Sequence, residues 1–246
     1  MLLKACLNGA RHPREHPALP VSPDQLAGDA TRVRGAGADA VHMHVKDDRG
    51  EDTLDGDALA SVLVAVRRAV PGLPIGVTTG AWAVADPAGR VSAVSAWTSL
   101  PDFASVNWHE PGAEQVASVL LERGVAVEAG LWYADAVRAW LVSPFRQRCL
   151  RVLLELPDGL DQRETDAEAG RLLDLLQRNA APDVPVLLHG EGSSCWPALQ
   201  YARGLGLDTR VGLEDVLELP DGSPAPDNAA LVAAALQLSS RSIGSR

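Results

Sequence analysis

ADAVHMHVKDDRGEDTLDGDALASVLVAVRRA, residues 38–69, contains one complete strand-to-helix unit. Residues 38–45 form a short apolar run, which is typical of a buried parallel strand. From Asp57 to Ala69 the apolar residues recur at helical spacing instead, and one helix face carries Leu59, Val62, Leu63 and Val66. The stretch therefore predicts a β-strand followed by an amphipathic α-helix.

The same alternation extends along the whole chain. Strand-like runs occupy residues 2–8, 38–45, 74–80, 103–108, 125–130, 151–156, 184–190 and 209–215. Helix-like segments occupy residues 23–34, 57–69, 86–97, 114–122, 134–141, 166–177, 196–203 and 228–238. Eight alternations without a linker predict a single domain, residues 1–246, folded as a (β/α)8 or TIM barrel. An open doubly wound sheet is the alternative, but no GxGxxG motif follows the first strand.

Composition excludes several classes of protein. The net charge of −10 is spread along the 246 residues, whereas a nucleic-acid binder needs a basic face. We find no apolar run of about 18 residues that could span a membrane. The three cysteines are isolated in the sequence, which fits a reducing compartment, and the opening MLLKACLNGA is too short for a signal peptide. We therefore expect a soluble protein of the cytoplasm.

Polar residues stand at the carboxyl end of every predicted strand, where (β/α)8 barrels collect their chemistry. These residues are Asn8, His42, His44, Thr78, Thr79, Asn107, His109, Glu128, Glu155, His189, Glu191, Glu214 and Asp215. Polar groups facing a barrel interior cost free energy unless they are partnered, so their concentration at one end indicates a functional site.

His42 and His44 are two residues apart on one strand, so both side chains can point into the barrel mouth. Neutral imidazoles together with a carboxylate suit a catalytic zinc site, and Glu214 ends a strand close to the first one in a closed barrel. An alternative is that both histidines bond to neighbouring carboxylates such as Asp47. The spacing alone leaves both interpretations open.

Three other features have two interpretations each. The HGEGSS loop, residues 189–194, can bind phosphate through backbone N–H groups, or Ser193 or Ser194 can simply cap the next helix. Trp82 and Trp108 follow strands and can wall a pocket or pack in the core. The acidic run through residues 47–52 is most simply a solvated turn.

Several motifs together resemble one family. They are NGA (8–10), LPVSPDQLAGDA (19–30), GADAVHMHVKDDRG (37–50), TTG (78–80), RVGLED (210–215) and DNAALV (227–232). Their order and spacing are similar to those of the β-keto acid cleavage enzymes, and the likeness runs from about residue 4 to residue 235. Each motif alone is weak, whereas the ordered set is specific.

The resemblance implies a zinc-dependent (β/α)8 barrel that forms a homotetramer. Such enzymes exchange acyl groups between a β-keto acid and acetyl-CoA, which gives acetoacetate and a new CoA thioester. The resemblance places the zinc ligands at His42, His44 and Glu214, and the catalytic roles at Asp215, Arg210 and Thr78. For substrate binding we expect several further residues at strand ends and in the loop after strand seven, namely Asn8, Thr79, Asn107, His109, Glu128, Gly190 and Glu191.

The chain also departs from the family pattern. Arg11 stands where an acid is usual, with Glu15 close by, and Gly130 and Val216 replace a glutamate and an asparagine. These departures leave two alternatives open. One is a metal-dependent aldolase, isomerase or hydrolase that does not use CoA, and the other is a non-catalytic protein that binds a metabolite.

Overall fold

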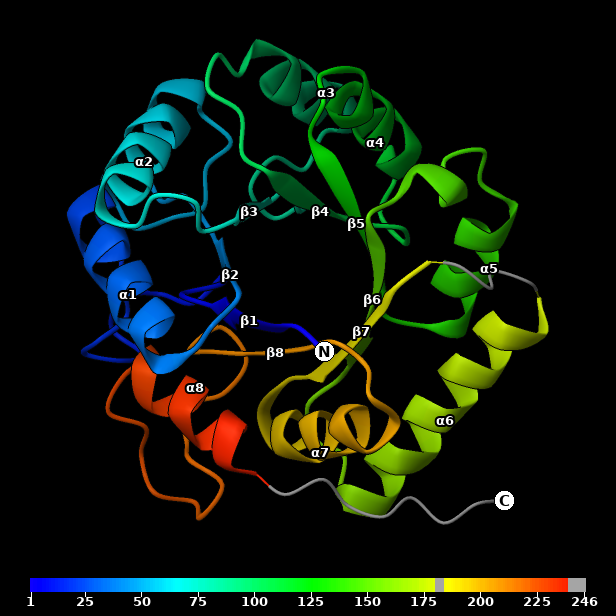
Figure 1. The fold of residues 1–246 in the computed structure, drawn as a ribbon. Helices are drawn as coiled ribbons and strands as arrows, with labels where there is room; N and C mark the ends of the chain where they lie inside the picture. The colour runs from blue at the N-terminus through cyan, green and yellow to red at the C-terminus, as the bar shows by residue number, and fades with distance from the viewer. Residues whose placement is uncertain (180–183, 239–246) are drawn as a thin grey trace.

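The computed structural model describes residues 1–179 and 184–238, in which eight strands and eight α-helices alternate (Figure 1). The strands are β1 Leu3–Cys6, β2 Ala40–Met43, β3 Ile75–Thr78, β4 Phe103–Asn107, β5 Ala126–Leu131, β6 Arg151–Leu156, β7 Val186–Gly190 and β8 Thr209–Val211. The helices are α1 Pro23–Ala36, α2 Gly56–Ala69, α3 Pro87–Ala96, α4 Ala113–Glu122, α5 Ala134–Val142, α6 Gln162–Arg178, α7 Cys195–Leu205 and α8 Asn228–Gln237. The predicted (β/α)8 barrel is confirmed.

The strands are parallel and follow the order β7-β6-β5-β4-β3-β2-β1-β8. The ring closes between β7 and β8, where Leu187 and Asp208 form a parallel bridge and Thr209 Oγ1 donates to the carbonyl of Leu188 at 2.8 Å. The helices surround this ring on its outside, as Figure 1 shows. This closure rules out the open doubly wound sheet.

The apolar core lies between the strands and the helices, with Met43, Leu63, Val66 and Leu120 among its fully or nearly fully buried side chains. The inside of the barrel is polar by contrast. Lys4 Nζ on β1 lies 2.5 Å from Glu128 Oε2 on β5, and both side chains are 1% exposed. A charged pair therefore spans the barrel interior, where each charge requires a partner.

Sequence-local signals explain where the helices begin. Ser22 caps α1, and its side chain accepts from the backbone N–H of Gln25 while the Gln25 side chain accepts from the Ser22 backbone. Helix α6 begins at Gln162, four residues before the predicted start at residue 166. Asp161 and Glu164 form a capping box there, and this polar first turn has no apolar periodicity to reveal it.

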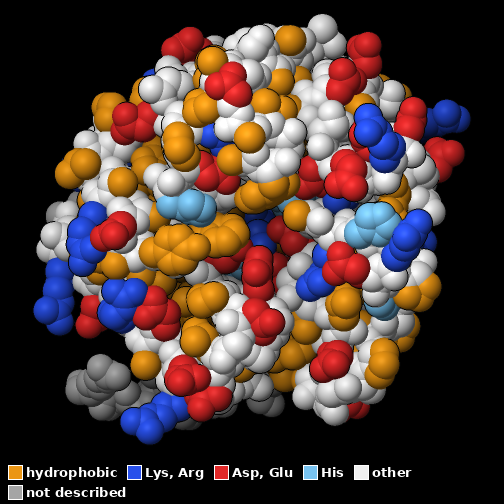
Figure 2. All heavy atoms as spheres, turned by 180° about the vertical axis from the view of Figure 1, so that it is seen from behind, with side chains coloured by type: hydrophobic (Ala, Val, Ile, Leu, Met, Phe, Trp, Pro, Cys, Tyr) orange, Lys and Arg blue, Asp and Glu red, His pale blue; other side chains and the backbone are white. Residues whose placement is uncertain are grey.

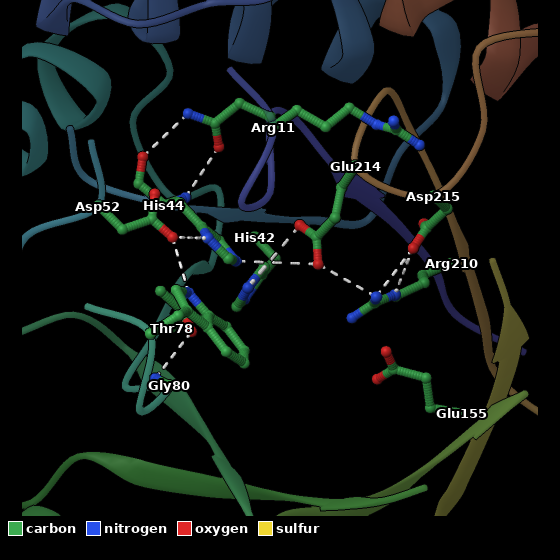
Figure 3. Close-up of polar contacts among 12 residues, drawn as sticks. Arg11, His42, His44, Asp52, Thr78, Gly80, Glu155, Arg210, Glu214 and Asp215 are labelled. Atoms are coloured by element: carbon green, nitrogen blue, oxygen red, sulfur yellow. Dashed lines mark hydrogen bonds and ion pairs between the residues drawn. The ribbon is translucent and has the colours of Figure 1, made fainter. Parts of the chain in front are cut away.

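Strand β8 is shorter than the predicted strand over residues 209–215 and ends at Val211. Gly212 passes so close to β1 that a Cβ atom there would lie 1.9 Å from the carbonyl oxygen of Cys6. The chain then turns, since Asp215 N–H donates to the carbonyl of Gly212 at 2.9 Å. Glu214 and Asp215 therefore lie in a turn after the strand, and this turn directs their side chains inward (Figure 3).

Among the described residues, no helix is both long and apolar enough to cross a membrane. Cys6, Cys149 and Cys195 are buried free thiols.

Candidate metal centre and active site

A cavity of about 360 Å³ opens at the carboxyl ends of the strands, a volume in the range of small-molecule sites. Figure 2 shows this hollow with acidic and basic side chains inside it and hydrophobic side chains beside it. The lining residues are Ala10, Arg11, Glu15, His42, His44, Thr78, Trp82, Ser105, Asn107, Trp132, Leu153, Glu155, Glu191, Arg210 and Glu214.

His42, His44 and Glu214 converge in this cavity (Figure 3). His42 Nε2 lies 3.9 Å from Glu214 Oε2, and His44 Nε2 lies 3.9 Å from Glu214 Oε1. One ligand atom from each of the three residues lies within 4.8 Å of the others. These separations are too long for direct hydrogen bonds but leave room for a cation between the three groups.

Two further observations fit a metal at this point. Glu214 Oε2 is buried without a hydrogen-bond partner among the described residues, although buried polar atoms are normally satisfied. Burial lowers the pKa of His42 well below its usual value, and the charge of Lys4 lowers it further. This lowering favours the neutral imidazole, which is the form that binds a metal. The cluster could hold a metal ion.

Arg210 stands beside the cluster on β8. Its Nη2 atom lies 2.8 Å from Asp215 Oδ1 and 3.1 Å from Glu214 Oε1. Asp215 is fully buried, and it does not line the cavity. Burial raises the pKa of Asp215, while the charge of Arg210 opposes this rise. Arg210 therefore connects a cavity-facing carboxylate with a buried one.

Thr78 lines the cavity, as predicted for a residue at the end of β3, and its hydroxyl accepts from the backbone N–H of Gly80 at 3.1 Å. Asn107 also lines it and donates to Glu110 Oε1 at 2.9 Å. Thr79 instead turns away, and its hydroxyl donates to the carbonyl of Ser105 at 2.7 Å.

Asn8 supports the histidine strand from behind the cavity. Its side chain donates to the carbonyl of His44 at 2.9 Å and accepts from the N–H of His44 at 2.8 Å. Gly190 packs closely against the following turn, because a Cβ atom there would lie 2.3 Å from Ser194 Oγ. Neither residue is in the cavity lining.

Glu128 and His109, which were also predicted to bind substrate, lie outside the cavity as well. Glu128 is not at the end of β5 but within it, paired with Lys4 and with Arg151 Nε at 3.2 Å. His109 is exposed and packs against Trp132 and Tyr133, with ring centroids 5.0 and 5.4 Å away. Glu128 lies three residues before the end of β5 at Leu131, and both of its ion pairs are inside the barrel.

Glu155 and Glu191 form a carboxyl pair on the cavity wall and hydrogen bond to each other. Burial raises the pKa of Glu191 to about 7, and the charge of Glu155 contributes to this rise. Burial also raises the pKa of Glu155. Glu155 further contacts His189, with Nε2 3.3 Å from Glu155 Oε2. Glu155 was among the polar strand ends noted in the sequence, but no catalytic or substrate-binding role was assigned to it there.

The turn after β2 holds a residue that the sequence did not reveal. Asp52, taken with its neighbours as part of a solvated turn, has a side chain only 5% exposed, and its Oδ2 atom lies 2.6 Å from His44 Nδ1. His44 therefore does bond a nearby carboxylate, but the partner is Asp52 and not Asp47. No local sequence signal separates Asp52 from the acidic residues beside it.

The backbone N–H groups of residues 191–194 in the HGEGSS loop all donate to acceptors of the chain itself. Ser194 stands at the N-cap position of α7, but neither its hydroxyl nor that of Ser193 bonds the first turn of the helix. The backbone N–H groups of Gly159 and Ser193 both donate to Asp158 Oδ1, at 2.7 and 2.8 Å. A carboxylate of the chain itself occupies the donors that a phosphate would need.

Of the two tryptophans that follow strands, Trp82 lines the cavity and Trp108 is buried in the core. Arg11, which stands in place of an acid, also lines the cavity. Its Nε donates to the carbonyl of Leu213 at 2.6 Å and its Nη1 contacts Glu15 Oε2 at 3.0 Å. An arginine paired with Glu15 therefore lies at the cavity, at a position where the resemblance implies an acid.

The fold and this site define a (β/α)8 barrel with a candidate metal centre at the carboxyl ends of its strands. The family model of the β-keto acid cleavage enzymes matches residues 1–243. The chain belongs to that family.

Curated relatives include a 3-oxoadipate:acetyl-CoA acetyltransferase of Cupriavidus necator, 26% identical over 239 residues, or 89% of this chain and 81% of the relative. Another is a 3-keto-5-aminohexanoate cleavage enzyme of Fusobacterium nucleatum subsp. nucleatum. It is 32% identical over 81 residues, or 32% of this chain and 30% of that protein.

Among solved structures, apo ObcA superposes with a TM-score of 0.71 at 20% identity, covering 88% of this chain and 61% of ObcA. The chain thus spans about three fifths of the length of ObcA, and the likeness is one of fold. ObcA has also been solved as a ternary complex with a C4-CoA adduct and oxalate.

Proposed function

We propose that this chain is a zinc-dependent β-keto acid cleavage enzyme. It condenses a β-keto acid with acetyl-CoA and cleaves the product by a retro-Claisen reaction to acetoacetate and a new acyl-CoA. The observation that carries the proposal is the placement of His42, His44 and Glu214 next to Arg210 within one cavity. Membership of the family and the acetyl-CoA-dependent relative support the same reaction.

His42, His44 and Glu214 would hold the zinc, with a coordination position left for substrate. When bound, zinc would act as a Lewis acid for charge that develops on the substrate oxygens and as a template that orients them. Arg210 lines the same cavity and adds a fixed positive charge beside the keto acid carboxylate. Thr78, at the end of β3, and Asn107, at the end of β4, would position the substrate.

The reaction also needs a base that removes a proton from the carbon between the two carbonyl groups. We assign this role to Asp215, whose Oδ2 atom has no hydrogen-bond partner among the described residues and whose Oδ1 is held by Arg210. Because Asp215 does not line the cavity, proton transfer requires a local movement that brings its Oδ2 atom to the substrate. Glu155 is the second candidate, since it lies on the wall itself.

The direct test is a panel of β-keto acids incubated with acetyl-CoA and zinc, with formation of acetoacetate and new thioesters as the readout. We expect turnover of at least one keto acid by the wild-type protein and none by His44→Ala. Turnover without a thioester would indicate an aldolase, isomerase or hydrolase instead. Binding of keto acids without turnover at saturating zinc would indicate a metabolite-binding protein.

We further propose that the protein assembles as a homo-oligomer, a tetramer by its resemblance to the family. Light scattering coupled to gel filtration would measure the mass of the assembly against the chain mass of 25.9 kDa.

A further inference from the structure

Asp52, in the turn between β2 and α2, makes three contacts through one buried carboxylate. Its Oδ2 atom lies 2.6 Å from His44 Nδ1 and accepts from Trp82 Nε1 at 2.7 Å. Its Oδ1 atom lies 2.5 Å from Lys46 Nζ, whose side chain is 1% exposed. The carboxylate is thus charge-balanced and connects two loops that follow different strands.

Trp82 contacts the same histidine a second way. Its ring stacks on His44 with centroids 5.8 Å apart and planes inclined by 9°. The indole therefore fixes the plane of the imidazole, while its N–H fixes the carboxylate that binds the imidazole edge. Together these contacts restrict both the tilt and the rotation of the His44 ring.

Gly80 makes this arrangement possible. A Cβ atom at position 80 would lie 2.2 Å from Trp82 Cζ2, so the indole can lie over His44 only because residue 80 lacks a side chain. The glycine N–H also donates to Thr78 Oγ1, which holds this short loop close to the end of β3.

These contacts also determine where the other ring nitrogen of His44, Nε2, points. With Nδ1 bonded to Asp52, His44 is set to present Nε2 toward Glu214 Oε1, 3.9 Å away (Figure 3). A carboxylate that accepts the second N–H of a ligating histidine fixes its tautomer and orientation and raises its basicity.

We propose that Asp52 and Trp82 form a clamp that positions His44 for metal binding. Both are positioning residues, because they act through the His44 ring. The inference rests on the metal site of the proposed function, and it predicts a contribution to metal affinity that is separable from catalysis.

The test measures the zinc affinity of purified protein by competition with a chromophoric chelator. Asp52→Asn is compared with Asp48→Asn, which removes the same charge from an exposed position of the same turn. We expect affinity to fall about 10- to 100-fold in the first variant and to stay unchanged in the second. Equal affinity of the two variants would overturn the clamp.

Two further variants keep the test decisive if Asp52→Asn does not fold. Trp82→Phe keeps a stacked ring but removes the N–H donor, whereas Gly80→Ala displaces the indole and leaves Asp52 intact. We expect both to weaken zinc binding and to alter the visible spectrum of the cobalt-substituted protein. Unchanged affinity and spectrum in both would contradict the proposal. If His42→Ala binds zinc as tightly as wild type, the metal site of the proposed function fails instead.

Discussion

A Cβ atom added to Gly130 would lie 2.4 Å from Asn107 Oδ1, so the Asn107 side chain fills the space beside this glycine. Asn107 Oδ1 also accepts from Trp132 Nε1 at 3.2 Å. At position 130, where the family resemblance implies a glutamate, the Asn107 amide and the Trp132 indole instead occupy the adjoining cavity wall.

Gly130→Ala should displace Asn107 and destabilise the fold. Forcing a methyl group into a packed site typically costs about 1–3 kcal/mol. Urea denaturation would measure the loss, and the Asn107→Ala change should relieve part of it in the double variant. A simple addition of the two single effects would show that the residues do not interact.

Zinc should stabilise the folded protein through the three-residue cluster. A ligand at about 100 times its Kd adds about 2.7 kcal/mol to the free energy of unfolding, so thermal unfolding should shift upward with added zinc and downward with a chelator. His42→Ala should abolish this shift. His109→Ala changes an exposed histidine outside the cavity and should retain the zinc-dependent shift. If this variant loses the shift, the metal binds at another site.

The rate of proton abstraction should show whether Asp215 or Glu155 is the catalytic base. Removing a general base typically lowers kcat by about 10²- to 10⁴-fold. We expect a loss of this size for Asp215→Asn, while Glu155→Gln should mainly raise KM because Glu155 lines the cavity. Deuterium exchange into the keto acid without CoA, measured by NMR above the spontaneous rate, reports this step alone. The opposite pattern would assign the base to Glu155.

Glu191 should make stability depend on pH. Its pKa in the folded protein is raised to about 7, mainly by burial, from a usual value of 4.5. The folded state therefore holds this proton more tightly than the unfolded chain does, and the free energy of unfolding should fall as the pH rises from 4.5 through about 7.

Glu191→Gln cannot ionise and should lack this part of the pH dependence. Urea denaturation of both proteins at about pH 5 and about pH 8 measures the difference, because titrations of groups that do not interact with residue 191 cancel. If the two proteins differ in free energy of unfolding by the same amount at both pH values, Glu191 has the same pKa in the folded and the unfolded protein.

Local sequence was sufficient to predict the barrel. Each strand is a short apolar run and each helix has a 3.6-residue apolar period. When eight such units follow each other, a closed barrel buries the apolar faces of all of them. The errors fell at element ends. Helix α6 begins in a polar capping box, and β8 stops where Gly212 meets the backbone of β1.

The sequence by itself determined which side chains stand near the strand ends, and it brought His42 and His44 onto one face through the two-residue period of a strand. Only the tertiary structure decided their partners. Asp52 bonds His44 across a turn, and Trp82 reaches both from the next loop. Glu214 meets the histidines because the barrel closes β8 onto β1. Local periodicity orients a side chain, whereas the contacts between distant segments depend on how the whole ring closes.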